Sequence, residues 1–174
     1  MGKVVLARVD SRLIHGQVAT SVSKAAGANA IFVADNTSAN DDFTKNIILA
    51  AGSQTGHKIR VLKEDGAVRY WNDRQYDDFN VILITKTVEI MYEIIKSGVP
   101  VTELNIGGIP HTPEATPIIN EVAITKAQLD LLIDLNESLG VNVFFQATPS
   151  LKKVTLQDAI KLFGDFFQKI ISID

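Results

Sequence analysis

The chain has 174 residues, of which 46% are hydrophobic and 21% are charged, with no cysteine and a formal net charge of −3. This length and composition are typical of one globular domain with a substantial core, and the lack of cysteine excludes disulfides and thiolate chemistry. The small negative charge gives no electrostatic support for non-specific binding to nucleic acid or to an anionic membrane.

Short apolar runs alternate with helical patterns along the whole chain. The apolar runs predict strands at residues 4–7, 30–34, 57–62, 80–84, 101–106, 121–124 and 141–145. Apolar residues at helical spacing predict helices at 14–25, 38–51, 67–72, 88–97, 126–139 and from about residue 155 onward. Thr87 and Thr125 are the expected N-caps of two of these helices. We therefore expect an α/β fold, with an open, mostly parallel sheet and helices on both faces, in a single domain over residues 1–174.

The last helix carries an apolar face that fits either docking on the sheet or a coiled-coil seam. Its members are Leu156, Ile160, Phe163, Phe167 and Ile170. Because the pattern covers little more than two heptads, docking on the sheet is the prediction.

The start of the chain shows no signal peptide, since Met1-Gly2-Lys3 leads directly into an apolar run. No apolar run reaches the roughly 18 residues that a membrane-spanning helix needs. We therefore expect a cytoplasmic protein, whose role at a membrane would come through a partner.

One stretch holds most of the chemistry, residues 8–18 with the sequence Arg-Val-Asp-Ser-Arg-Leu-Ile-His-Gly-Gln-Val. It lies between the first predicted strand and the first predicted helix. Asp10 or Ser11 could cap that helix, which would place His15 in or near its first turn.

The residue types in this stretch are those of a nucleophile beside an anion site. A helix N-terminus disfavours an imidazolium and attracts anions, so His15 would be a neutral nucleophile next to a bound phosphoryl group. Arg8 and Arg12 would give that group bidentate, permanently charged donors. Asp10 would hold a ring nitrogen of His15, or would orient one of the arginines.

Polar residues and glycines follow three other predicted strands. Asp35, Thr85 and the pair Gly107-Gly108 stand at the carboxyl ends of these strands. Ligands of open α/β sheets bind beyond those ends, so we expect these residues to form the wall of one crevice with His15. The two glycines would let the backbone approach a phosphate closely.

Several other functions fit parts of the pattern. Arg8, Asp10 and Arg12 could form only a surface ion-pair network, or a non-enzymatic module could use the two arginines to hold a phosphorylated ligand. A nucleotide-dependent oxidoreductase or kinase needs a glycine-rich turn after the first strand, and a serine hydrolase needs a G-x-S-x-G elbow; neither motif is present. His57 and His111 lack carboxylates at metal-ligand spacing, so we expect no metal and no cofactor.

The first motif narrows these alternatives. The string Arg8-x-Asp10-x-Arg12-Leu-Ile-His15-Gly-Gln-Val-Ala-Thr20 resembles the active-site signature of the IIB proteins of the bacterial phosphoenolpyruvate-dependent sugar phosphotransferase system, mannose/fructose/sorbose family. The run Asn-Ile-Gly-Gly that ends at Gly108 and the chain length are similar to that family as well. One position departs from the resemblance, because members often carry a tryptophan shortly after Val-Ala-Thr, where this chain has Ser21-Val22.

The resemblance implies a phosphocarrier of carbohydrate uptake, a protein-histidine phosphotransferase to sugar. His15 would accept a phosphoryl group on its Nδ1 nitrogen from a IIA phosphohistidine. It would then pass the group to a sugar at the membrane partners IIC and IID, with which the protein would associate peripherally. Mannose, fructose, sorbose and N-acetylgalactosamine all remain open. The segment from Phe145 to Pro149 is similar to amino-sugar systems and favours the last of these.

Overall fold

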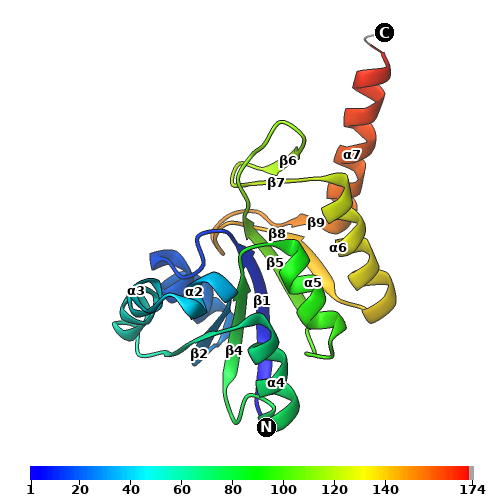
Figure 1. The fold of residues 1–174 in the computed structure, drawn as a ribbon. Helices are drawn as coiled ribbons and strands as arrows, with labels where there is room; N and C mark the ends of the chain where they lie inside the picture. The colour runs from blue at the N-terminus through cyan, green and yellow to red at the C-terminus, as the bar shows by residue number, and fades with distance from the viewer. Residues whose placement is uncertain (173–174) are drawn as a thin grey trace.

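The fold is built on a seven-stranded sheet, which a computed structural model describes over residues 1–172 (Figure 1). The strands lie in the order β3-β2-β4-β1-β5-β8-β9, and every pair is parallel except β8 with β9. Their bounds are β1 Lys3–Asp10, β2 Ala30–Ala34, β3 Lys58–Leu62, β4 Asn80–Thr85, β5 Glu103–Gly108, β8 Asn142–Phe145 and β9 Val154–Thr155. A separate antiparallel hairpin consists of β6 Thr116–Ile119 and β7 Val122–Ile124.

Helices connect the parallel strands. Their bounds are η1 Val18–Val22, which is π-helical, α1 Ser23–Ala26, α2 Asn36–Asn40, α3 Asp42–Ser53, α4 Glu64–Arg74, α5 Val88–Lys96, α6 Lys126–Leu139 and α7 Leu156–Ile171. Thr87 and Thr125 cap α5 and α6 as predicted, and Thr125 forms a reciprocal capping box with Gln128. Among residues 1–172, no helix has both the length and the apolar character needed to cross a membrane.

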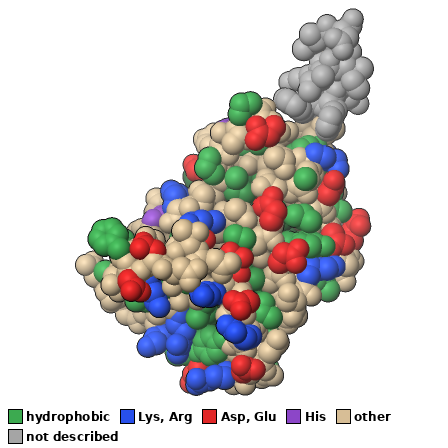
Figure 2. Space-filling model, in the orientation of Figure 1, with side chains coloured by type: hydrophobic (Ala, Val, Ile, Leu, Met, Phe, Trp, Pro, Cys, Tyr) green, Lys and Arg blue, Asp and Glu red, His purple; other side chains and the backbone are tan. Residues whose placement is uncertain are grey.

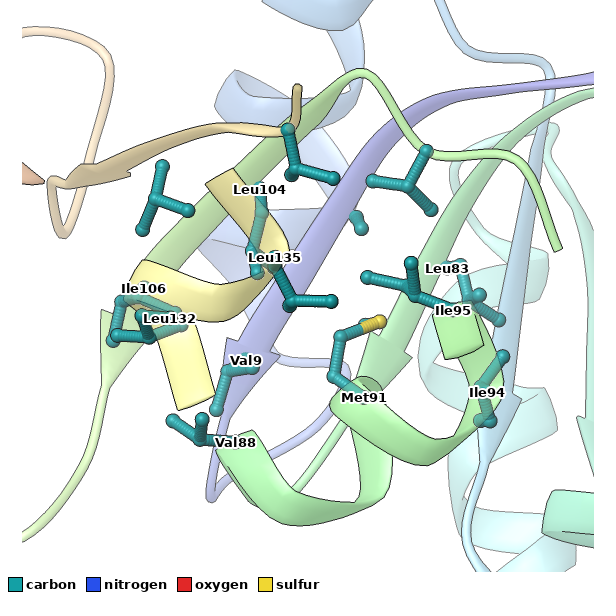
Figure 3. Close-up of a cluster of buried hydrophobic side chains, with 14 of the residues drawn as sticks. Val9, Leu83, Val88, Met91, Ile94, Ile95, Leu104, Ile106, Leu132 and Leu135 are labelled. Atoms are coloured by element: carbon teal, nitrogen blue, oxygen red, sulfur yellow. The ribbon is translucent and has the colours of Figure 1, made fainter. Parts of the chain in front are cut away.

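The sheet is buried on both faces because alternate residues of its central strands point to opposite sides. In β4, Leu83 belongs to the larger core cluster and Ile84 to the smaller one. The larger cluster joins the sheet to α5, α6 and α7, and Figure 3 shows Met91 of α5 and Leu135 of α6 over the strands. The smaller cluster joins the other face to η1, α3 and the loop before η1. The predicted mostly parallel sheet with helices on both faces is confirmed.

The structure differs from the sequence prediction in three connections. The single helix expected at 38–51 is two helices, because Asp41 adopts an extended conformation between them and caps α3 through Thr44. The strand expected at 121–124 belongs to the separate hairpin, whose other strand, β6, was not predicted. β9 was also missed, since two residues carry too little pattern to detect.

The last helix is docked on the core over the part whose side chains the structure describes. Leu156 and Phe163 are buried, and Ile160 packs against the larger core cluster. The side chains of Phe167 and Ile170 lie outside the described residues.

The carboxyl ends of β1, β2, β4, β5 and β8 all lie at one edge of the sheet, because these strands are parallel. The pairing of β1 with β5 is irregular there: Val9 is opposite Ile106, but Asp10 is opposite Gly108, so Gly107 is an extra residue. Such a bulge redirects the local side chains and is common beside active sites.

Candidate functional site

The loop after β1 brings His15 to the carboxyl edge of the sheet. The Asp10 carbonyl accepts a hydrogen bond of 2.9 Å from the Leu13 amide, and Ser11 N–H donates to Gly108 at 2.9 Å. The first helical hydrogen bond runs from Ala19 N–H to the His15 carbonyl at 3.1 Å, so His15 lies immediately before the first helical turn. The predicted cap by Asp10 or Ser11 is wrong, because Asp10 closes a turn that precedes the helix.

Leu13 anchors this loop at a conformational cost. Its φ angle is +59°, in the left-handed region, which typically costs about 1–3 kcal/mol for a residue with a side chain. Leu13 and Ile14 are buried with Val18 and Ile48 in the smaller core cluster. Apolar burial of the two side chains offsets the strain and fixes the position of the residue that follows them, His15.

Asp10 is the centre of the site. Its carboxylate has no exposed surface, and it accepts hydrogen bonds from three side chains. The Oδ2 oxygen lies 2.9 Å from Nη2 of Arg8 and 3.0 Å from Nε2 of His15. The Oδ1 oxygen accepts from the backbone N–H of Arg12 at 3.1 Å and from its Nε at 3.0 Å. Burial alone would raise the pKa of Asp10, but the hydrogen bonds from Arg12 and His15 and the charge of Arg8 outweigh it and lower this pKa.

Arg8 lies below Asp10 and is enclosed, with 1% of its side chain exposed. Its Nη1 donates to the side-chain oxygen of Asn105, and its Nη2 donates to the Ala147 carbonyl at 2.9 Å. Burial lowers the pKa of Arg8, and the charge of Asp10 partly offsets that effect. The guanidinium therefore supports Asp10 from inside the protein.

The two glycines of β5 make room for these buried side chains. A Cβ added at Gly107 would lie 2.1 Å from Cζ of Arg8, and one at Gly108 would lie 2.7 Å from Oδ1 of Asp10. The sequence prediction placed both glycines in a crevice wall that a phosphate could approach. In the structure the space beside them is filled by Arg8 and Asp10.

Arg12 and His15 are the solvent-facing members of the site. The Arg12 side chain is 51% exposed and the His15 side chain is 21% exposed. Arg12 also donates from Nη2 to Asp10 at 3.1 Å, and this pairing raises the pKa of Arg12. The site therefore consists of a histidine and an arginine at the surface and a carboxylate and an arginine beneath them.

Asp35 and Thr85, the other two predicted wall residues, have local structural partners. Asp35 caps α2 by accepting from Ser38 N–H at 2.8 Å, and it pairs with Nζ of Lys86 at 3.0 Å. Thr85 donates to the Thr87 carbonyl at 2.9 Å. Neither side chain shares a hydrogen bond with Arg8, Asp10, Arg12 or His15 in the described part of the chain.

Sequence reasoning missed the groups that hold Arg8. Asn105 lies beside Arg8 on the neighbouring strand, is 2% exposed, and donates to the Gln146 carbonyl at 3.0 Å. An amide in the middle of an apolar strand, two residues before Gly107, was the available signal. The carbonyls of Gln146 and Ala147 leave no signal in a sequence, because every residue has one.

The close approach of Gly107 to Arg8 predicts a specific effect of adding one methyl group. Gly107→Ala must displace the guanidinium, and overpacking of this kind typically costs about 1–3 kcal/mol. Urea denaturation should show that loss. Gly164→Ala is the matched control, because a Cβ there meets no atom within 4 Å. Equal stability of Gly107→Ala and wild type would contradict the packing described here.

The lowered pKa of Asp10 predicts a pH-dependent contribution to stability. A carboxyl group with a lowered folded-state pKa stabilises the fold above its unfolded-state pKa, about 3.9 for Asp, and loses that contribution as the pH falls through the folded-state value. The difference in unfolding free energy between wild type and Asp10→Asn should therefore be largest above about pH 5 and shrink below about pH 4. The exposed Asp73→Asn should differ little from wild type throughout. A difference for Asp10→Asn that stays constant with pH would refute the assignment.

Comparison with known proteins identifies the family of this chain. Residues 4–167 match the family described as the PTS system sorbose subfamily IIB component. The sorbose-specific EIIB component of Klebsiella pneumoniae is 29% identical, covering 91% of this chain and 95% of that protein. The N-acetylgalactosamine-specific phosphotransferase enzyme IIB component 2 of Escherichia coli is 31% identical, covering 90% and 98%.

Solved structures share the fold over nearly the same span. ManxB from Thermoanaerobacter tengcongensis superposes with a TM-score of 0.86 at 33% identity, covering 92% of this chain and 96% of that one. The IIBSor domain of the sorbose permease from Klebsiella pneumoniae gives 0.80 at 28% identity, covering 91% and 96%. The chain belongs to the sorbose-subfamily IIB components of the sugar phosphotransferase system.

Proposed function

We propose that His15 is the residue that carries the phosphoryl group in this IIB component. The observation that carries the proposal is the hydrogen bond between its Nε2 and the buried Asp10, because it leaves Nδ1 as the nitrogen free to attack. A carboxylate on one ring nitrogen keeps the proton there and stabilises the imidazolium that forms when the other nitrogen bonds to phosphorus. Nδ1 is also the nitrogen that the family resemblance implies.

The proposed reaction is two successive in-line displacements at phosphorus. In the first, the Nδ1 lone pair of His15 forms a bond to phosphorus while the P–N bond of a IIA phosphohistidine breaks and its electron pair returns to that imidazole. In the second, a sugar hydroxyl oxygen attacks phosphorus, the bond to Nδ1 breaks with its electron pair returning to the His15 imidazole, and the hydroxyl proton passes to solvent. Such transition states spread charge over the equatorial oxygens, so positioning and electrostatics provide most of the catalysis.

The two arginines have different roles in this proposal. Arg12 is half exposed beside His15, and it is the guanidinium suited to bind the phosphate oxygens. Arg8 is enclosed, with its nitrogens directed at Asp10, Asn105 and a backbone carbonyl, so it acts through Asp10 as a positioning residue. The sequence prediction had both arginines bind phosphate; their burial supports that role for Arg12 alone.

The proposed partners are a IIA protein or domain as phosphoryl donor, the membrane components IIC and IID, and a sugar of the mannose family, N-acetylgalactosamine among them. The chain matches 47% of the mannose-specific EIIAB component of Escherichia coli, whose name joins a IIA to a IIB part. Relatives of similar identity are named for sorbose and for N-acetylgalactosamine. In this arrangement the protein works in the cytoplasm and meets the membrane through IIC and IID.

Replacement of His15 tests the proposal directly. His15→Ala should fold like wild type, because the side chain is at the surface, but it should take up no acid-labile, base-stable label from phosphorylated IIA. His57→Ala and His111→Ala should label like wild type. Retained labelling of His15→Ala would place the phosphate elsewhere. Phosphate that binds His15→Ala and wild type equally, without a covalent label on either, would favour a non-enzymatic phosphate-binding module.

Lysine substitutions separate the two arginines. Arg12→Lys keeps the charge but loses the planar fork, and we expect single-turnover transfer from phosphorylated IIA to slow by about 10²–10³-fold with little change in melting temperature. Arg8→Lys should lower the melting temperature, because a lysine cannot replace all the buried hydrogen bonds of Arg8. Wild-type transfer by Arg12→Lys would exclude it from phosphate binding.

A further inference from the structure

Helix α3 exposes two large apolar side chains to solvent instead of burying them in the core. Phe43 is 74% exposed and Ile47 is 53% exposed, and their spacing of four residues places them on one face of the helix. We call this pair the α3 patch. Single exposed apolar residues are ordinary, but neighbouring ones on one rigid element are typical of binding sites.

The α3 patch lies near the edge of the sheet that carries His15. Helix α2 leaves the carboxyl end of β2 at Asp35, and α3 begins directly after it. Ile48, the neighbour of Ile47, packs in the same core cluster as Leu13 and Ile14, which precede His15. Figure 2, in the orientation of Figure 1, shows a hydrophobic side chain projecting on the side of the molecule where α3 lies.

A protein that exchanges a phosphoryl group with His15 must cover the surface around it. His15 lies at the surface with 21% of its side chain exposed, so the reacting groups of the two proteins meet at their interface. A standard interface buries about 800 Å² on each partner, which is a disc of about 16 Å radius. The start of α3 follows α2 at the carboxyl edge of the sheet, the same edge that carries His15.

We propose that the α3 patch is a docking anchor for the protein that donates the phosphoryl group, the phosphorylated IIA partner. This inference rests on the proposed function of His15. Charge favours the donor over the sugar-side partners: a phosphohistidine arrives with negative charge and meets the half-exposed Arg12, whereas the sugar-side partners arrive when this chain already holds the phosphate. Phenylalanine and arginine are both enriched in protein interfaces relative to the rest of the surface.

Two phosphoryl donors of different size test the inference. Phosphorylated IIA must dock, whereas phosphoramidate, a small phosphoryl donor, needs only access to His15. In the double variant Phe43→Ser, Ile47→Ser, labelling of His15 by phosphorylated IIA should have a second-order rate constant about 10–100-fold below wild type. Labelling by phosphoramidate should be unchanged. Leu139→Ser on α6 is the matched control, since Leu139 is 51% exposed, and it should change neither rate.

The other results each overturn the inference. Wild-type labelling of the double variant by IIA would exclude the α3 patch from docking. An equal loss of labelling rate with both donors would mean that the patch maintains the structure of the site and does not dock the partner. Normal labelling by IIA combined with slower onward transfer to sugar, in membrane vesicles that contain IIC and IID, would assign the patch to the sugar-side partners. Failure of wild-type His15 to label with either donor would instead reject the proposed function.

Discussion

The rest of the site depends on the buried carboxylate of Asp10, whose negative charge must be compensated by neighbouring groups. An isolated carboxylate removed from water costs several kcal/mol, so Asp10 needs charged and hydrogen-bonding partners within reach. Arg8 approaches from inside, Arg12 from the turn, and His15 from the start of the helix. Only glycine fits at the last two positions of β5, because any larger residue there would displace Arg8 or Asp10. The irregular pairing of β1 with β5 and the strained Leu13 can both be understood as parts of the frame that holds this one carboxylate.

Burial separates two residues that look equivalent in the sequence. Arg8 and Arg12 stand on either side of Asp10 and share the same chemistry, but one has 1% and the other 51% of its side chain exposed. The reason is the end of β1 at Asp10: Arg8 is still within the strand and is covered by the fold, whereas Arg12 lies in the turn beyond it. The buried guanidinium of Arg8 can therefore orient Asp10, whereas the half-exposed guanidinium of Arg12 can meet a ligand that arrives from solvent.

The sequence was sufficient for the parts that follow from local pattern. Alternating apolar strands and helices predicted the parallel sheet, and Thr87 and Thr125 predicted two helix starts. The clustering of Arg8, Asp10, Arg12 and His15 predicted the site, because these residues are close in the chain. The role of Asn105 and of the glycines in β5 depends on strand order, which brings positions nearly a hundred residues apart into contact. A local pattern can mark Asn105 as unusual but cannot show which residue it contacts. For the same reason the sequence did not show that the strand at residues 121–124 pairs with β6.

The hydrogen bond that Nε2 of His15 donates to Asp10 has a kinetic consequence for the proposed cycle. With one ring nitrogen held, both the arriving and the departing phosphoryl group must pass through Nδ1, from the same open side of the ring. Two proteins cannot occupy that side together, so each must dissociate before the other binds. A long-lived complex with either partner would then slow the whole cycle, because the next partner cannot bind until the first has dissociated. A carrier built in this way favours partners that bind briefly, and the flux of sugar sets an upper limit on how tightly either partner can hold it.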